Sequence, residues 1–453
     1  MNSHQELKPS RYNIAIPVGT SNNYILFNTL TKAILLVDSE LVEFVRKGNY
    51  RRNPKITQLL VNNGILTDER TNELNVFKVL YESEKYSFES AMFTIITTYE
   101  CNLNCPYCYE GHVRQEHLIK SDAFPIVEFI KKFAEKNNSE HVYVHLYGGE
   151  PLLNLLPGLV IFNEVEEWAT KQEVELTRGI SSNGVLFTQQ VINVLSKHQP
   201  LEIAISVNGS KKVHDRRRFT RNGEGTYDII MANIRKLVDT PSNVTLCINL
   251  DRDNINDIDK LLEHLEEIGL KDKVQIIFSF IKEACPSAHH YLPLCFTTDE
   301  QCKIFPKIWK LALERGFRIA MPRLQNSSYC QYLKFSGMVI DPLRCIYKCV
   351  DAVGLKDQIV GKIDERGVAE YYPAFYDWMS RDPLHFESCR SCKFLPICCG
   401  GCPLISYFRH GTYDKPNCGA ERLYPVKLVL NALMTRPDLK KVADLETISS
   451  LIR

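Results

Sequence analysis

The chain has 453 residues, of which 44% are hydrophobic and 24% charged, and its formal net charge is +1. This length predicts about three domains, and the near-neutral charge argues against a general nucleic-acid or membrane-surface role. No apolar run is long enough to span a membrane, and the polar first ten residues lack the apolar core of a secretory signal. We therefore expect a cytoplasmic enzyme in which many of the sixteen cysteines bind metal.

Residues 1–88 predict a small separate domain. Apolar residues that alternate with polar or small ones predict three strands, at residues 12–18, 24–27 and 33–37. Three helices should follow: Asp38 is a candidate N-cap of the first, Pro54 a candidate first residue of the second, and the third should cover residues 72–81.

Three strands followed by three helices resemble the RiPP recognition element, a winged-helix-like module that binds the leader of a ribosomally made precursor peptide. The resemblance implies that the leader adds a strand to an exposed sheet edge, a mode that needs little specific sequence. The alternative is a cap that only covers the neighbouring domain. A DNA-reading role would require a basic face, which this segment lacks.

Residues 89–290 predict alternating strands and helices. Six strands are expected, at residues 92–98, 141–147, 175–180, 201–207, 244–250 and 274–280. Amphipathic helices are expected between them, for example at residues 123–136, 189–197 and 258–268. This order predicts an α/β fold with a parallel sheet, right-handed crossovers and a site at the carboxyl ends of the strands.

Three cysteines follow the first of these strands: Cys101, Cys105 and Cys108, with Tyr107 just before the last. One loop can place three thiolates on three corners of a [4Fe–4S] cluster and leave the fourth iron open to a small molecule. A zinc knuckle would want a fourth ligand at suitable spacing, and a disulfide set an even number of cysteines. The spacing resembles the CxxxCxxC motif of radical S-adenosylmethionine (SAM) enzymes, which implies a partial (β/α)6 barrel and places Tyr107 at the cofactor site.

Two polar motifs end the second and third strands. Gly148 and Gly149 let the backbone approach a ligand closely, and the carboxylate of Glu150 can accept from an ammonium group. The resemblance implies that these three residues bind the methionine amino group of SAM. Ser182 and Asn183 could serve the same site, although a capping turn explains them equally well.

A third polar motif ends the fourth strand, where Ser206 is followed by Asn208 and later by Arg218. It resembles a family segment in which the Ser and the Arg contact SAM, the Arg meeting its carboxylate as a fork. The family has Asp where this chain has Asn208, so a role for charge there is in doubt. Arg216 and Arg217 are expected to be solvated surface residues.

Residues 291–453 are expected to be a bridging region followed by a domain with two further clusters. Their cysteine spacing resembles the seven-cysteine SPASM domain, which holds two auxiliary [4Fe–4S] clusters. The resemblance implies four ligands for the second cluster: Cys389, Cys392, Cys398 and Cys418. It implies three ligands for the first: Cys330, Cys349 and Cys402. A pair of structural zinc ions is the alternative.

Six cysteines have no motif and are expected to be packing thiols: Cys247, Cys285, Cys295, Cys302, Cys345 and Cys399. Cys345 has a second possible role. Either it completes the first auxiliary cluster, or one iron of that cluster stays open and can bind a substrate thiolate.

The three parts together resemble the maturases of ribosomally made peptides. This implies reductive cleavage of SAM, with electrons from a flavodoxin- or ferredoxin-type protein, and hydrogen abstraction from a precursor peptide with a leader sequence. The chain looks most like enzymes that join a Cys sulfur to a carbon, although a carbon–carbon crosslinker would share every motif.

Two other functions remain as alternatives. An anaerobic sulfatase maturase would use an Asp directly after the position of Cys349, where this chain has Val350 and then Asp351. A non-catalytic iron–sulfur scaffold would need no SAM pocket.

Overall fold

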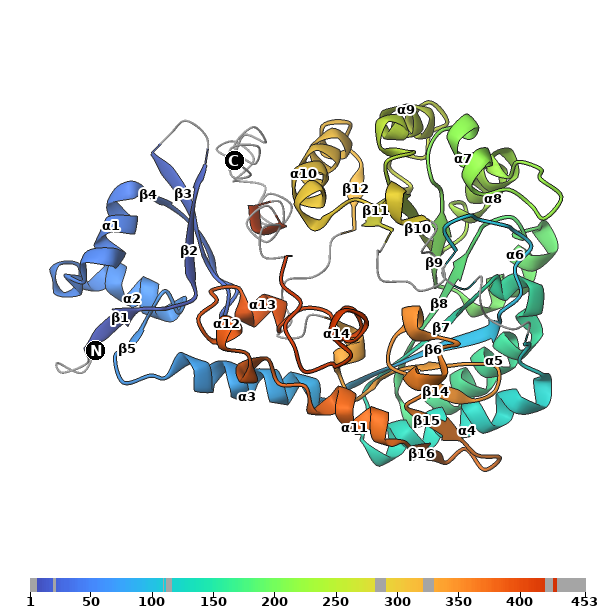
Figure 1. Cartoon of the computed structure of the whole chain (residues 1–453), viewed down its shortest axis with the longest axis horizontal. Coiled ribbons are helices and arrows are strands. Elements are labelled where there is room, and N and C mark those ends of the chain that lie inside the picture. Colours follow the sequence, from blue (N-terminus) through green and yellow to red (C-terminus); the bar gives the residue numbers. More distant parts are fainter. Residues whose placement is uncertain are drawn as a thin grey trace.

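The N-terminal part of the computed structural model is built on a three-stranded antiparallel sheet (Figure 1). The structure describes residues 6–18, 22–108, 110, 116–281, 291–320, 330–419 and 427–429. The sheet has the order β2–β3–β4, with β2 at Asn13–Val18, β3 at Asn23–Asn28 and β4 at Ile34–Asp38. Both β2 and β4 are edge strands of this sheet.

Three helices follow the sheet, as predicted: α1 (Ser39–Lys47), α2 (Pro54–Asn62) and α3 (Glu73–Lys85). The Asp38 side chain accepts from Leu41 N, and Pro54 lies in the first turn of α2. The sequence did not predict the antiparallel pair of β1 (Leu7–Pro9) and β5 (Leu66–Asp68), because strands of three residues are too short to show an alternation.

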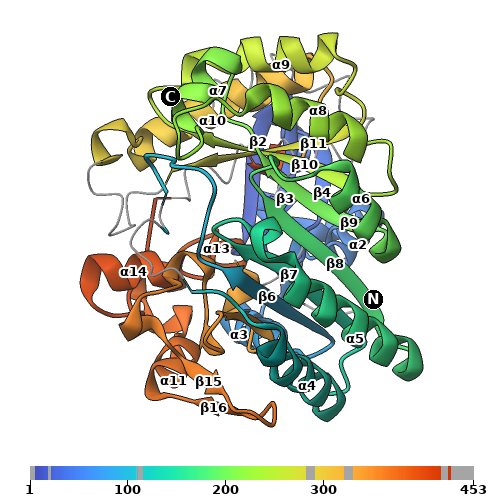
Figure 2. The same ribbon diagram turned by 90° about the vertical axis from the view of Figure 1, so that its right-hand side faces the viewer.

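Six parallel strands in sequence order form the predicted barrel: β6 (Ser90–Thr98), β7 (His141–Gly148), β8 (Glu175–Ser182), β9 (Leu201–Ser206), β10 (Asn243–Leu250) and β11 (Val274–Phe280). The short strand β12 (Arg318–Ile319) extends the sheet in parallel beyond β11. The crossover helices cover its outer face (Figure 2): α4 (Lys120–Lys136), α5 (Leu155–Gln172), α6 (Gln189–Leu195), α7 (Lys211–Arg217), α8 (Tyr227–Leu237), α9 (Ile258–Glu267) and α10 (Thr298–Glu314).

The inner face of the barrel is polar, as β7 illustrates. Val142, Val144 and Leu146 are completely buried in the core shared with the helices, whereas the residues between them face the other side of the strand. On that side His145 forms hydrogen bonds with Tyr143 Oη (2.9 Å) and Ser181 Oγ (2.8 Å). The barrel interior can therefore hold polar groups next to the strand ends.

The cysteine-rich C-terminal part continues the same sheet. Strand β13 (Gly337–Ile340) pairs in parallel with β6, and β14 (Cys345–Tyr347), β15 (Gly361–Ile363) and β16 (Ala369–Tyr371) follow as antiparallel neighbours. Four helices come after them: α11 (Pro373–Ser380), α12 (Glu387–Arg390), α13 (Leu395–Cys398) and α14 (Pro403–His410). This pairing brings the C-terminal cysteines to the barrel.

The N-terminal part packs directly against the C-terminal part. Tyr12, Phe77 and Tyr81 form one buried cluster with residues of the cysteine-rich segment, including Cys389 and Cys399. Thr29 Oγ1 donates to Lys393 O at 2.5 Å, and Lys32 Nζ donates to Pro396 O at 3.1 Å. None of the helices described in the structure combines the length and apolar character needed to cross a membrane.

Candidate active site

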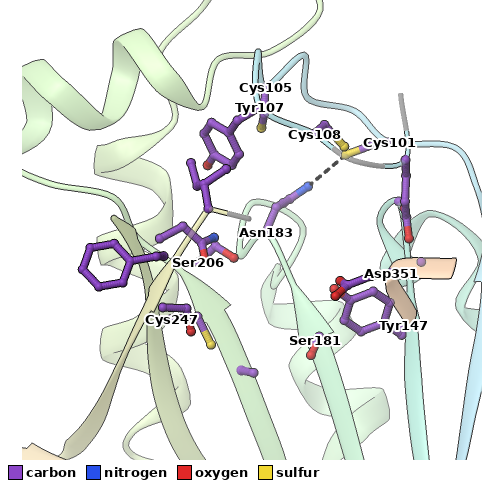
Figure 3. Close-up of a pocket in the computed structure, with 18 of the residues that line it drawn as sticks. Cys101, Cys105, Tyr107, Cys108, Tyr147, Ser181, Asn183, Ser206, Cys247 and Asp351 are labelled. Atoms are coloured by element: carbon purple, nitrogen blue, oxygen red, sulfur yellow. Dashed lines mark hydrogen bonds between the residues drawn. The ribbon is translucent and has the colours of Figure 1, made fainter. Parts of the chain in front are cut away.

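A cavity of about 420 Å³ lies at the carboxyl ends of the six parallel strands (Figure 3). It collects all but one of the predicted SAM-site residues, and the exception, Glu150, is completely buried behind the wall. The predicted residues that line it are Cys101, Cys105, Tyr107, Cys108, Gly148, Gly149, Ser182, Asn183, Ser206 and Arg218. The first and last of these motifs, at Cys101 and Ser206, are more than a hundred residues apart in sequence. They converge because parallel strands end at one edge.

The three cysteines of the loop after β6 are partly buried and close together. Burial, together with the smaller effects of nearby carboxylates and cysteines, raises the pKa of Cys101 to about 11 and that of Cys108 to about 12. Leu103 N (3.5 Å) and Asn183 Nδ2 (3.7 Å) both donate to Cys101 Sγ. These donors stabilise a thiolate that burial disfavours, so the loop fits bound iron better than free thiols.

Among the described residues, no three His, Cys, Asp or Glu side chains are placed to hold one metal ion. A cube of four irons would hold each cysteine at a separate corner.

Gly148 and Gly149 fit against the backbone that leads into the cysteine loop. A Cβ on Gly148, where φ is +129°, would lie 2.2 Å from Thr98 O. A Cβ on Gly149 would lie 2.5 Å from Glu100 O and 2.6 Å from Tyr99 O. The sequence predicted that the two glycines let the backbone approach a ligand. In the structure they also let it pack closely against the backbone just before Cys101.

The variant Gly149→Ala is expected to displace the cysteine loop, because rigid backbone carbonyls occupy the space of the new methyl group. We expect a loss of about 1–3 kcal/mol in the free energy of unfolding, with reduced iron incorporation. Urea unfolding of the metal-free chain and iron analysis of the reconstituted chain measure the two effects. Unchanged stability and iron content would contradict this packing role.

Glu150 is held by three hydrogen bonds from the protein. Its carboxylate accepts from Leu152 N (3.1 Å), Ser182 Oγ (2.9 Å) and Asn183 N (2.7 Å). Burial nevertheless raises the pKa of Glu150 to about 7, because the hydrogen bonds and Arg218 offset only part of the desolvation. Ser182 and Asn183 thus orient the Glu150 carboxylate.

Tyr107 and Arg218 are connected through the tyrosine hydroxyl. Arg218 Nη1 lies 3.0 Å from Tyr107 Oη, and Asn208 Nδ2 also bonds to this oxygen. The amide oxygen of Asn208 accepts from Asn249 N at 3.1 Å. Asn208 therefore bonds both to the cysteine loop, through Tyr107, and to β10, through Asn249.

The prediction that Arg217 is a solvated surface residue is wrong. Its side chain is 1% exposed, and Nη1 lies 2.7 Å from Asp251 Oδ1 and 3.0 Å from Tyr291 Oη. The guanidinium carbon is 5.1 Å from the centre of the Tyr107 ring. Neighbouring residues of a helix point about 100° apart, so Arg216 stays exposed and pairs with Asp253 while Arg217 turns inward.

The cysteines predicted for the second auxiliary cluster lie together. Burial and the nearby charges of Cys398, Cys418 and Cys392 raise the pKa of the Cys389 thiol to about 12. Residues predicted for the first auxiliary cluster also share neighbours, since Tyr332 lies near both Cys330 and Cys349. Cys402 lines the cavity that holds the SAM motif cysteines.

A buried lysine adjoins the Cys330 and Cys349 side of this region. Lys348 is 1% exposed, and its Nζ donates to Lys334 O and Gly337 O, both at 2.6 Å. Burial lowers the pKa of Lys348 to about 7, and the charge of Cys330 opposes this shift. A buried cation bonded to carbonyls suits an anionic group such as an iron–sulfur cluster with thiolate ligands.

Comparison with known proteins identifies the central part of the chain. A model of the radical SAM superfamily matches residues 95–265. This protein is a radical SAM enzyme. Its sequence is 23% identical over 345 residues to a cysteine-type anaerobic sulfatase-maturating enzyme of Clostridium novyi, covering 70% of this chain and 89% of that one. It is 19% identical over 466 residues to the radical SAM cyclopropyl synthase TigE of Paramaledivibacter caminithermalis, covering 92% and 93%.

Solved structures share the fold of this radical SAM enzyme. The structure of anSMEcpe with bound AdoMet superposes with a TM-score of 0.58 at 16% identity, covering 80% of this chain and 98% of that one. Streptococcus suis SuiB bound to precursor peptide SuiA gives 0.54 at 14% identity, covering 91% and 99%. The predicted fold class is thereby confirmed: a partial barrel with a small N-terminal sheet and a cysteine-rich C-terminal region.

Sequence patterns missed several residues that line the cavity of this radical SAM enzyme. Tyr147 precedes Gly148 and could have been found from the alternation along β7. Asp351 and Phe408 come from the C-terminal part, and nothing local in the sequence places them here. Cys247, expected to be a packing thiol, also lines the cavity, because it faces inward from β10.

The other cysteines without a motif have different surroundings. Cys295, Cys302, Cys345 and Cys399 are buried, as expected for packing thiols, and Cys285 lies outside the described residues. Burial and the charge of Asp341 raise the pKa of Cys345 to about 11, while Lys362 opposes the rise.

Proposed function

We propose that this radical SAM enzyme removes a hydrogen atom from a ribosomally made precursor peptide and thereby forms an intramolecular crosslink. We propose a bond between a Cys sulfur and a carbon as the product class. The single observation that carries the proposal is the composition of the cavity. Cys101, Cys105 and Cys108 share its wall with Cys402, one of the predicted auxiliary ligands, and with Asp351. A peptide bound there would meet the SAM side and the C-terminal side together.

The chain's own residues suit this task. The cluster on the three motif cysteines, with SAM bound to it, supplies the carbon-centred radical that abstracts hydrogen. We propose that the Glu150 carboxylate, buried behind the cavity wall, accepts from the SAM ammonium group, and that Arg218, which lines the cavity, binds the SAM carboxylate. Phe280, Leu404 and Phe408 make the wall apolar, which helps to exclude water from a reactive intermediate. Asp351 can accept the proton that a substrate group loses.

Three auxiliary assignments belong to this proposal. The N-terminal sheet binds the leader, the two C-terminal cysteine sets hold two [4Fe–4S] clusters, and a flavodoxin- or ferredoxin-type protein supplies electrons. The extent of the structural match supports the leader step: the structure of SuiB bound to a precursor peptide covers 91% of this chain, whereas that of anSMEcpe covers 80%. TigE likewise covers 92% of it.

The leader is expected to pair with edge strand β4, where Leu36 is 37% exposed. The variant Leu36→Asp should weaken leader binding by roughly tenfold, since a charge replaces an apolar contact worth about 1–2 kcal/mol. Fluorescence anisotropy with a labelled leader measures it. Leu59→Asp on α2, at a residue 52% exposed, is the matched control. Equal binding by the two variants would contradict this docking edge.

A second candidate function is supported by the position of Asp351. The sequence argued against an anaerobic sulfatase maturase because Val350 stands directly after Cys349. In the structure the short helical turn at Val350–Ala352 brings Asp351 to the cavity despite that one-residue offset. An acidic residue is therefore available at the substrate, and formylglycine formation on a sulfatase is retained as the alternative.

The deciding experiment is anaerobic co-expression with the short Cys-containing peptide encoded beside the gene, followed by mass spectrometry before and after thiol alkylation. Loss of two hydrogens per link, with cysteines that no longer alkylate, supports the thioether once fragmentation excludes a disulfide. The same mass loss with thiols that still alkylate indicates a carbon–carbon or ring-forming enzyme. An unchanged peptide, with SAM cleavage demonstrated, would favour a sulfatase substrate.

A further inference from the structure

Arg381 is a buried cation beneath the loop that joins the two predicted sets of auxiliary ligands. Its side chain is 1% exposed. Nη2 donates to Gly400 O (2.7 Å) and Lys415 O (3.1 Å), and the guanidinium carbon lies 4.8 Å from the centre of the Phe386 ring. The guanidinium is thereby fixed under residues 398–402, the stretch from Cys398 of one set to Cys402 of the other.

Two nitrogen donors of Arg381, Nε and Nη1, are buried, and neither has a hydrogen-bond partner among the described residues. No carboxylate among the described residues forms an ion pair with Arg381 either. Leaving buried donors of a charged group unsatisfied destabilises the folded state. An anionic acceptor for these two nitrogens would therefore have to come from a bound group.

The cysteines next to Arg381 identify the kind of acceptor. Tyr81, Cys389, Cys402 and Asp414 all lie close enough to interact electrostatically with the guanidinium. The two cysteines among them belong to different predicted clusters. Gly400, with φ at +78°, makes room for it: a Cβ there would lie 3.2 Å from both Nη1 and Nη2. An anion held on these cysteines is therefore a candidate acceptor for Nε and Nη1.

We propose that Arg381 donates hydrogen bonds from Nε and Nη1 to sulfur atoms of the auxiliary clusters and raises their reduction potentials. This rests on the proposed function, which places the clusters on these cysteines. A cluster with thiolate ligands is anionic, and reduction adds one further negative charge. A buried cation favours the more negative state, and hydrogen bonds to sulfur act in the same direction.

The test is a redox titration of the reconstituted full chain, followed by electron paramagnetic resonance. The background is Cys101→Ala, Cys105→Ala and Cys108→Ala together, so that only C-terminal clusters contribute to the signal. Arg381→Gln should lower the equilibrium constant for reduction of at least one cluster by roughly tenfold, which is about 59 mV for one electron. Arg381→Lys, which keeps the charge, should shift it less.

Arg178→Gln is the matched control. Arg178 is a buried arginine of β8 with an unpartnered Nε, but it pairs with Glu166 at 2.7 Å and has no cysteine neighbour among its ion-pair and hydrogen-bond contacts. Its replacement should leave both potentials unchanged. A shift of the same size in Arg178→Gln and Arg381→Gln would overturn the proposal.

Iron analysis separates the possible failures. Clusters present in Arg381→Gln with unchanged potentials would overturn the role of Arg381 and leave the proposed function intact. Absence of C-terminal iron in the parent chain would instead overturn the cluster assignment itself. If Arg381→Gln loses iron, retention in Arg381→Lys supports the need for a cation, whereas equal loss in both means that Arg381 only packs the loop, and overturns the proposal.

Discussion

Replacing Cys101, Cys105 and Cys108 together by alanine is expected to abolish formation of 5′-deoxyadenosine while the C-terminal clusters remain. The three cysteines come from one loop at the mouth of the barrel, whereas the predicted C-terminal ligands come from other segments of the chain, although Cys402 lines the same cavity. We expect iron per chain to fall from about twelve to about eight atoms, since each cluster contains four irons. Product formation should fall by at least roughly a thousandfold, because the uncatalysed cleavage is negligible.

Chromatography of the nucleoside and iron analysis of the reconstituted chain measure both effects. Thermal unfolding is the control for folding, and the variant should remain folded because the loop lies outside the strands that form the core. Retained nucleoside formation would contradict the assignment of these cysteines. Loss of all iron would contradict the independence of the C-terminal clusters.

Glu150→Gln is expected to weaken SAM binding by roughly tenfold to a hundredfold. The carboxylate is completely buried, and a charge-assisted hydrogen bond to an ammonium group contributes about 1.5–3 kcal/mol. The amide cannot reproduce that charge, and its NH2 group would also face a backbone or hydroxyl donor. Isothermal titration of SAM to the reconstituted enzyme measures the affinity, with the exposed Glu140→Gln as control.

The pH dependence of SAM affinity provides a sharper test of the same carboxylate. With the pKa of Glu150 raised to about 7 by burial, part of the free enzyme carries a neutral carboxyl group at neutral pH. An ammonium group binds the ionised form, so the proton must leave first. Affinity should therefore rise by about tenfold per pH unit below 7 and become constant above it. Glu150→Gln should abolish this dependence. If the SAM affinity of the variant kept the same slope against pH, the role of Glu150 would be contradicted.

Features with local signals were predictable from the sequence. Asp38 and Pro54 mark helix starts through side-chain and ring geometry that act within one turn, and both lie where predicted. The six barrel strands follow from their apolar patterns, and the cysteine loop from its spacing. Because parallel strands end at one edge, the convergence of Ser182, Ser206 and Arg218 followed from the strand order.

Features that depend on long-range packing were not predictable in this way. The pairing of β13 with β6 joins residues more than two hundred positions apart, and no local pattern specifies it. That pairing brings Asp351 to the cavity, which its one-residue offset from the expected position did not indicate. Arg217 looked like its exposed neighbour Arg216, because a run of arginines does not reveal which side chain turns toward Asp251.

Ser182 and Asn183 have a role that the sequence alone did not indicate. The sequence offered SAM contact or a capping turn as equal interpretations. Both residues line the cavity, and both bond to the Glu150 carboxylate. Their contribution therefore includes orienting a charged group that is itself buried, which spacing alone does not indicate.

The most direct test of the proposed hydrogen abstraction uses a precursor peptide in which carbon-bound hydrogens are replaced by deuterium. The reconstituted enzyme is incubated anaerobically with this peptide, SAM and a reductant, and the 5′-deoxyadenosine is examined by mass spectrometry. Our account predicts that one deuterium appears in the nucleoside for each crosslink formed in the peptide. Unlabelled 5′-deoxyadenosine together with a crosslinked peptide, or an unchanged peptide under conditions of rapid SAM cleavage, would contradict it.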